Sequence, residues 1–101
     1  MFYNVINVKD LVNLNESKYA KETLMEHASN SLNIISLKKG EIIETHTSVE
    51  DAAVYVIDGE IEIHFPAEQY KIKKEELIMF QKNKEHKVLA NKDSKFFVIK
   101  I

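Results

Sequence analysis

The sequence predicts an all-β protein, either an antiparallel sandwich or a barrel, and two observations carry this prediction. From residue 31 onward, short apolar segments are separated by turn signals at a fairly even spacing. Several of these segments alternate apolar and polar residues, which is the pattern of a strand with one buried face. The 101 residues are enough for one compact domain and too few for two ordinary ones. We therefore expect a single β-domain.

The first thirty residues are harder to assign. Residues 3–8 have the β-rich character of a strand, and residues 9–14 favour a short helical turn. Residues 16–28 consist mostly of good helix formers, with Ala20, Leu24 and Ala28 at helical spacing. Local evidence alone therefore favours a helix in this last segment.

The clearest turn signal is the Asp58-Gly59 pair, which lies between two apolar runs. It favours a two-residue hairpin, because both central positions of such a turn need positive φ and these residues tolerate it best. The run before it, residues 52–57, is apolar on both alternating faces, as in a central strand that is covered on both sides. Residues 60–65 alternate polar and apolar side chains, so this strand is expected to bury one face.

The other predicted strands follow the same pattern. They lie at residues 32–37, 70–72, 77–80 and 96–101, with turns at 38–40, 66–68, 82–84 and 91–94. In the first of them the alternation slips at Ile34-Ile35. That strand is therefore either buried on both faces or interrupted by a bulge.

Composition excludes several classes of function. The chain has no cysteine, which excludes disulfides, cysteine-bound metals and thiol nucleophiles. Fourteen basic and sixteen acidic residues give a net charge of −2, without the one-signed field that attracts nucleic acid. All the basic residues are lysine, so the planar guanidinium that grips phosphate is missing. No segment has the pattern of a signal peptide or a membrane span, so we expect a cytoplasmic protein with no nucleic-acid or membrane partner.

Residues 40–59 resemble the first motif of the cupin superfamily, written G-x5-H-x-H-x(3,4)-E-x6-G. Gly40, His46 and Gly59 fall at the spacing of that motif. The second motif, G-x5-P-x-G-x2-H-x3-N, is similar to residues 75–90, where only His86 matches. The glycine, proline, glycine and asparagine of the second motif correspond to Glu75, Gln81, Asn83 and Ala90. Asn83 is a fair substitute for glycine, because asparagine accepts left-handed backbone better than most residues.

This resemblance implies a double-stranded β-helix, the cupin jelly-roll barrel, over residues 21–101, with residues 1–20 as a short amino-terminal arm. It also implies a strand rather than a helix over residues 22–27, and we follow it because tertiary context often overrides local propensity. Small cupins often form homodimers in which the amino-terminal strand crosses to the neighbour. A homodimer is therefore expected, with residues 1–8 as the crossing strand.

In cupins, the motif histidines and glutamate bind a divalent transition metal, because alternating residues of a strand point into the barrel together. Here Ser48 replaces the second histidine and Ala52 replaces the glutamate, and neither supplies an equivalent ligand. Only His46 and His86 remain as metal ligands, so the resemblance implies a degenerate metal site. A divalent transition metal is the one cofactor it allows.

A replacement ligand would restore such a site. Glu50 lies two residues before Ala52 and shares its face if the strand is extended there, although about 6.6 Å further along. Glu44 has the same parity as His46 and is a second possibility. With such a ligand, the protein would be a metal-dependent enzyme of the oxygenase or isomerase type, which is the alternative function. A metal-free enzyme with a histidine as general base is a variant of this alternative.

The function that we expect first is binding of a small polar molecule in the barrel pocket, without catalysis. The resemblance allows sugars, organic acids and amino-acid derivatives and selects none of them. The residues expected to line this pocket are His46, Ser48, Ala52, Val54, Val56, His86 and Val88. Residues 37–41 and 54–61 also resemble cyclic-nucleotide-binding domains, but those hold the phosphate with an arginine that this chain lacks.

Overall fold

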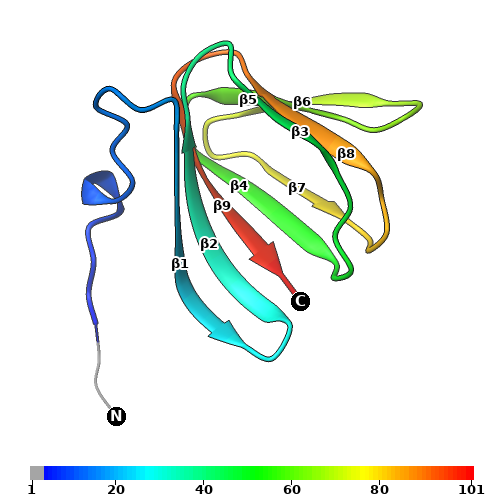
Figure 1. Cartoon of the computed structure of the whole chain (residues 1–101), viewed down its shortest axis with the longest axis horizontal. Helices are drawn as coiled ribbons and strands as arrows, with labels where there is room; N and C mark the ends of the chain where they lie inside the picture. Colours follow the sequence, from blue (N-terminus) through cyan, green and yellow to red (C-terminus); the bar gives the residue numbers. More distant parts are fainter. Residues whose placement is uncertain (1–3) are drawn as a thin grey trace.

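The computed structural model of the chain describes residues 4–101, which form nine β-strands arranged in two antiparallel sheets (Figure 1). One sheet contains, in order, β1 (Tyr19–His27), β2 (Asn30–Leu37), β9 (Ser94–Lys100), β4 (Ala52–Asp58) and β7 (Leu77–Phe80). The other contains β3 (Ile42–His46), β8 (His86–Ala90), β5 (Glu60–His64) and β6 (Gln69–Lys73). The expected all-β jelly-roll barrel is confirmed. Residues 4–101 include no helix long and apolar enough to cross a membrane.

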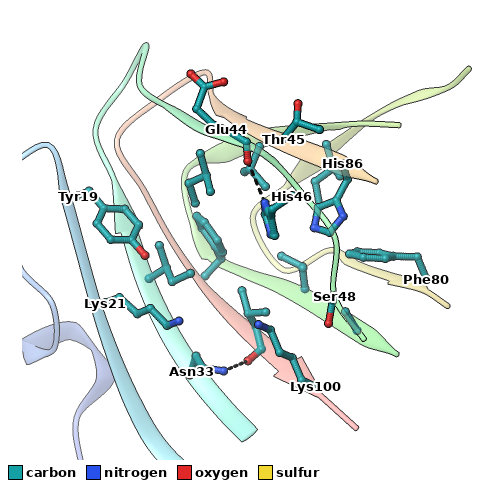
Figure 2. A pocket seen from close by; sticks show the side chains of 18 residues that line it. Tyr19, Lys21, Asn33, Glu44, Thr45, His46, Ser48, Phe80, His86 and Lys100 are labelled. Atoms are coloured by element: carbon teal, nitrogen blue, oxygen red, sulfur yellow. Dashed lines mark hydrogen bonds between the residues drawn. The ribbon is translucent and has the colours of Figure 1, made fainter. Parts of the chain in front are cut away.

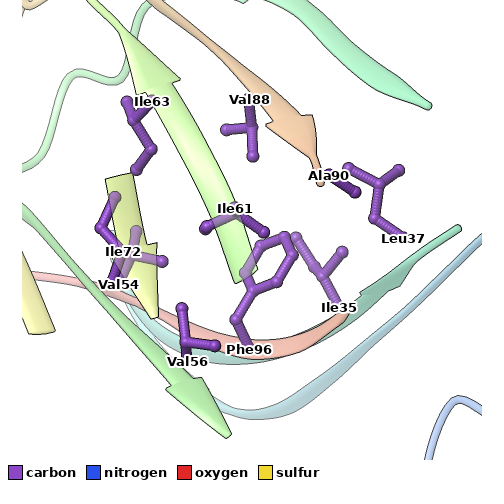
Figure 3. Close-up of a cluster of buried hydrophobic side chains, with 10 residues drawn as sticks. All are labelled: Ile35, Leu37, Val54, Val56, Ile61, Ile63, Ile72, Val88, Ala90 and Phe96. Carbon is purple, nitrogen blue, oxygen red and sulfur yellow. The ribbon is translucent and has the colours of Figure 1, made fainter. Parts of the chain in front are cut away.

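The core lies between the two sheets, where alternate side chains of both point inward (Figure 3). Its members are Ile35, Leu37, Val54, Val56 and Phe96 from one sheet and Ile61, Ile63, Ile72, Val88 and Ala90 from the other. The largest fully buried side chain is Phe96. Burying one such large apolar side chain stabilises the fold by about 1.5–3 kcal/mol. Five of these core residues also line a cavity between the sheets, namely Ile35, Val54, Ile63, Val88 and Phe96.

The strand predicted over residues 22–27 is confirmed, against the local preference for a helix. β1 pairs with β2 along nearly its whole length, from Tyr19 opposite Leu37 to His27 opposite Asn30. One bulge interrupts this ladder between Thr23 and Met25. The long antiparallel ladder pairs the backbone groups on the β2 side of this edge strand, which outweighs the small helix preference of its side chains.

The strand predicted over residues 3–8 is wrong for the part that the structure describes, since Tyr3 lies outside the described residues. Residues 4–7 have no regular structure, and Val8–Asp10 form a single 3-10 turn, η1. Lys95 on β9 holds this arm in place, because its Nζ donates to the carbonyl oxygens of Val8 (3.2 Å) and Lys9 (3.1 Å). It also donates to Asn13 Oδ1 at 3.3 Å.

The hairpin predicted at Asp58-Gly59 is also wrong. β4 pairs with β7 and β9 in one sheet, whereas β5 pairs with β6 and β8 in the other. Asp58 ends β4 opposite Lys95, and Gly59 alone has positive φ, at +91°. A single left-handed residue therefore turns the chain from one sheet to the other. The dipeptide signals a sharp turn but does not determine which strands pair.

Two other local predictions can be resolved. In β2, both Ile34 and Ile35 are buried, so the slipped alternation reflects burial on both faces. The bulge lies on the partner strand instead. Asn83 has φ of +65°, which confirms it as a substitute for the motif's glycine. Glu75, at the motif's first glycine, is left-handed too, with φ of +70°.

Candidate functional site

A cavity of about 430 Å³ lies between the two sheets, next to the core, and is lined by residues of both (Figure 2). Its surface is mostly apolar, and a limited set of polar side chains converges on it. The polar residues that line it are Tyr19, Lys21, Asn33, Glu44, Thr45, His46, Ser48, His86 and Lys100. A mostly apolar cleft of this size with a few polar groups is typical of a small-molecule site.

The two motif histidines lie side by side at the cavity wall. His46 on β3 is the register partner of His86 on β8, and the centroids of their rings are 4.3 Å apart. Each Nδ1 donates to a backbone carbonyl two residues earlier, at 2.9 Å to Glu44 and 2.7 Å to Lys84. A carbonyl oxygen only accepts, so these contacts fix both rings with the proton on Nδ1. In each ring this leaves Nε2 as the nitrogen that can accept a hydrogen bond.

The environment of His86 favours its neutral form. The side chain is 5% exposed and lies against Phe80 and Phe65, with ring centroids 4.8 Å and 5.9 Å away. Burial lowers the pKa of His86 below its usual value, and the hydrogen bond to Lys84 only partly opposes this. At neutral pH the Nε2 of His86 is thus an acceptor of hydrogen bonds.

The replacement ligand predicted at Glu50 does not join the histidines. Glu50 lies outside β4 and is not part of the cavity wall. Its Oε1 accepts a hydrogen bond from Ser48 Oγ, and its backbone N–H donates to the same Oγ, both at 3.2 Å. Glu50 was predicted from an extended backbone up to Ala52, but this turn around Ser48 breaks the alternation.

The donors present do not form a metal centre. Among residues 4–101 no three His, Asp or Glu side chains are grouped so that they could hold an ion. The motif positions that would complete the set are occupied by Ser48, whose hydroxyl is bound to Glu50, and by the methyl group of Ala52. Two imidazoles alone bind a divalent ion weakly compared with a full set of three or four ligands. The residues therefore do not fit the resident metal that the resemblance allows.

Most of the predicted pocket residues do line the cavity. Those brought together are His46, Ser48, Ala52, Val54, His86 and Val88. Val56 is the exception: unlike Val54 and Val88, which belong to both the core and the cavity wall, it does not line the cavity. It shares the inward face of β4 with Ala52 and Val54 but lies further along the strand, beyond the floor of the cavity.

Five polar lining residues were not predicted from the sequence, one of which, Thr45 on β3, precedes His46. Tyr19 and Lys21 come from β1, Asn33 from β2 and Lys100 from β9. The helix-like composition of β1 hid the first two, since their inward direction follows only from pairing with β2. Lys100 has the same strand parity as the buried Phe96, so alternation along β9 is a signal that could have revealed it.

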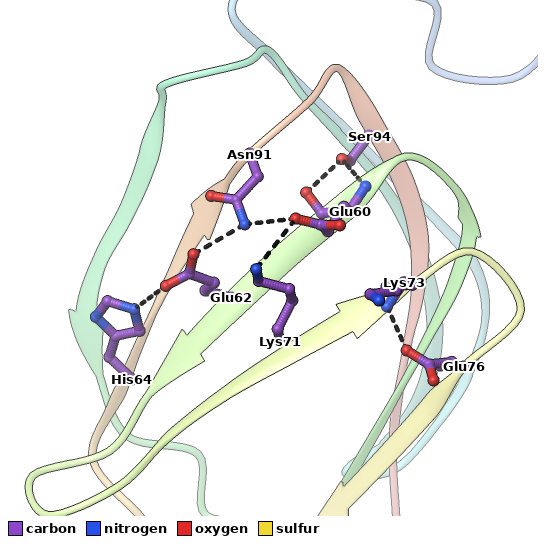
Figure 4. Close-up of polar contacts among 8 residues, drawn as sticks. All are labelled: Glu60, Glu62, His64, Lys71, Lys73, Glu76, Asn91 and Ser94. Atoms are coloured by element: carbon purple, nitrogen blue, oxygen red, sulfur yellow. Dashed lines mark hydrogen bonds and ion pairs between the residues drawn. The ribbon is translucent and has the colours of Figure 1, made fainter.

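A second polar cluster lies outside the cavity, on the outer face of the smaller sheet (Figure 4). Asn91 Nδ2 donates to Glu60 and Glu62, at 2.9 Å and 2.8 Å, and His64 Nε2 lies 2.8 Å from Glu62 Oε1. Hydrogen bonds from His64 and Asn91 lower the pKa of Glu62. These side chains are hydrogen-bonded to one another, so we interpret the cluster as a structural network on the surface of the sheet.

Comparison with protein-family models gives one match, the Cupin domain model Cupin_2, over residues 33–100. This range contains the strands that carry both histidines. No curated protein matches the sequence.

Comparison with solved structures supports the same fold. A conserved protein of unknown function from Streptococcus pyogenes superposes with a TM-score of 0.89 at 22% identity, covering 100% of this chain and 89% of that one. A Cupin 2 conserved barrel domain protein from Leptotrichia buccalis gives 0.87 at 28% identity, covering 95% of this chain and 47% of that one. A cupin superfamily protein from Desulfitobacterium hafniense gives 0.79 at 18% identity, covering 82% and 76%.

Proposed function

The chain belongs to the Cupin domain family, and from that premise we propose that its barrel binds a small polar molecule in the cavity between the two sheets. The observation that carries the proposal is the cavity itself, about 430 Å³ and largely apolar, with two oriented imidazoles on one wall. A preformed cleft of this kind excludes water from a ligand while a few polar groups fix its orientation.

The two imidazoles offer hydrogen-bond acceptors to a ligand in the cavity. Their Nδ1 protons are already donated to Glu44 and Lys84, so each ring offers one Nε2 lone pair. Such a pair of acceptors suits hydroxyl or amino groups of a ligand. Replacement of the motif's glutamate by Ala52 also leaves space in the cavity where a ligand atom fits. The same lone pairs could coordinate an ion, but among residues 4–101 neither Glu44 nor any other carboxylate is grouped with both histidines as a set of metal ligands, and Glu50 accepts a hydrogen bond from Ser48.

The test is a binding screen against a library of neutral sugars and polyols, hydroxy acids, unsubstituted carboxylic acids and amino acids. We expect at least one compound to raise the melting temperature, because a ligand at 100 times its Kd stabilises the native state by about 2.7 kcal/mol. Calorimetry on that compound then measures its Kd for the wild type and for two variants.

Ala52→Leu adds a larger side chain at the cavity wall and is expected to weaken binding at least about tenfold, because the ligand and the new methyl groups compete for the same space. Ala53→Leu is the matched control, since Ala53 lies on the opposite face of β4 and outside this cavity. Unchanged affinity in Ala52→Leu, or a library in which nothing binds, would contradict the proposal.

A further inference from the structure

The charges that line the cavity are unbalanced. Lys21 and Lys100 contribute two cations, and Glu44 is the one carboxylate among the lining residues that the structure describes. Figure 2 shows the Glu44 carboxylate turned away from both lysines, while their ammonium groups extend toward the cavity. Within residues 4–101 neither ammonium has a carboxylate oxygen within 4.0 Å, since the ion pairs found involve other residues.

The strand register explains why these two lysines share one wall. Lys21 on β1 lies opposite Ile35 on β2, which lies opposite Phe96 on β9. Lys100 is four residues beyond Phe96 on the same strand and so has the same parity. Ile35 and Phe96 belong to the inward core face, so the backbone directs both lysines to that face. The imidazoles of His46 and His86 lie on the facing sheet.

Asn33, between the two lysines, is fully occupied by the protein. Its Oδ1 accepts from Thr23 Oγ1 at 2.7 Å, and its Nδ2 contacts Ser31 Oγ at 2.9 Å and the carbonyl of Val98 at 3.2 Å. Asn33 therefore ties β1, β2 and β9 together rather than offering a donor to a ligand. This network holds the two strands that carry Lys21 and Lys100 in a fixed relation. Of the two lysines on this wall, Lys21 is exposed and Lys100 is partly buried.

We propose that the ligand of this cavity is a small hydroxylated carboxylic acid. Its carboxylate lies between the ammonium groups of Lys21 and Lys100, and its hydroxyl groups donate to the Nε2 atoms of His46 and His86 on the facing wall. The inference rests on the proposed binding function and names the class of ligand. Neither ammonium has a carboxylate partner, and a cation attracts an anion more strongly where water is partly excluded, as it is at the partly buried Lys100. The free imidazole lone pairs supply the complementary selectivity for hydroxyl donors.

The test compares three probes that separate the two recognition elements. Gluconate carries a carboxylate and hydroxyl groups, glucitol carries hydroxyl groups alone, and hexanoate carries a carboxylate alone. Isothermal titration of each into the full chain is expected to give gluconate the highest affinity, at least about tenfold above both others, because only gluconate uses both walls. Added salt is expected to weaken gluconate binding and to leave glucitol binding unchanged.

Two variants assign the anion site. Lys21→Gln and Lys100→Gln each remove one charge at nearly constant side-chain length, and each is expected to weaken gluconate binding about tenfold without changing glucitol binding. Lys87→Gln is the control, because Lys87 lies on β8 outside the cavity wall and its loss changes the net charge equally. Equal affinity for gluconate and glucitol, or insensitivity to both variants, would overturn the acid proposal.

The results of these experiments distinguish the failure of the acid proposal from the failure of the proposed binding function. If a neutral compound from the screen binds and Ala52→Leu weakens it, while gluconate and hexanoate do not bind, the cavity is a ligand site but not an acid site. If nothing binds, including all three probes, the binding function itself is wrong. If Lys87→Gln weakens gluconate as much as Lys100→Gln does, the effect reflects overall charge, and the assignment of the anion to this wall is overturned.

Discussion

Replacing Gly59 by alanine is expected to destabilise the protein by at least about 3 kcal/mol, more than most single substitutions. Gly59 has φ of +91°, which side chains with a Cβ rarely adopt. A Cβ there would lie 2.5 Å from the carbonyl oxygen of Asp93 and 2.7 Å from Ser94 Cα, both backbone atoms that cannot move aside freely. It would also press on Ser94 Oγ, which accepts a hydrogen bond from the Glu60 N–H at 3.0 Å. The turn that carries the chain from one sheet to the other would therefore have to open.

Gly40→Ala is a control that separates the strain of the left-handed backbone from the close contacts of the added Cβ. Gly40 has a similar φ of +85°, but nothing lies within 4 Å of the position of its Cβ. We expect Gly40→Ala to lower the free energy of unfolding only by the strain of the left-handed backbone, about 1–2 kcal/mol. Urea unfolding of the wild type, Gly59→Ala and Gly40→Ala gives the three free energies of unfolding. They are comparable if the dependence of the free energy on urea concentration is the same in all three. Equal losses in the two variants would show that the close contact at Gly59 contributes nothing.

Phe96→Ala is expected to cost about 3–5 kcal/mol, the usual range for removing a buried aromatic side chain. Phe96 is 1% exposed, lies in the core and also forms part of the cavity wall. Phe97→Ala is the matched control, because the next residue on β9 points to the opposite face, where it is partly exposed and stacks on Tyr55 with centroids 6.4 Å apart. Chemical unfolding should show a clearly smaller loss for Phe97→Ala. A similar loss in both variants would mean that the face between the sheets is not the main core.

The sequence contained enough information to identify the fold, through the motif around Gly40, His46 and Gly59. That resemblance correctly outweighed the helix-forming composition of β1. Pairing with β2 stabilises the strand by more than local propensity stabilises a helix. Local sequence signals predicted the pairing of strands less well, because pairing depends on the topology of the whole fold. Asp58-Gly59 marks a real turn, yet whether a turn joins two paired strands or two sheets depends on distant partners.

The candidate site was predictable in part, for the same reason. Strand alternation within the motifs placed His46 and His86 in the cavity together with Ala52. Alternation gives the face of a residue but not its depth, so Val56 was assigned to the pocket although it lies in the core. Lys21 and Lys100 come from opposite ends of the sequence and meet at one wall only through the β1-β2-β9 pairing. No motif connects them.

Transition-metal content distinguishes a ligand cavity from a metal enzyme most directly. We propose that His46 and His86 serve as hydrogen-bonding groups for a ligand, since the groups around them among residues 4–101 do not complete a set of metal ligands. Elemental analysis of protein purified without chelators or a histidine tag is predicted to give far less than one transition metal per chain, with no change in His46→Ala. Near-stoichiometric metal in the wild type that His46→Ala abolishes would contradict the account.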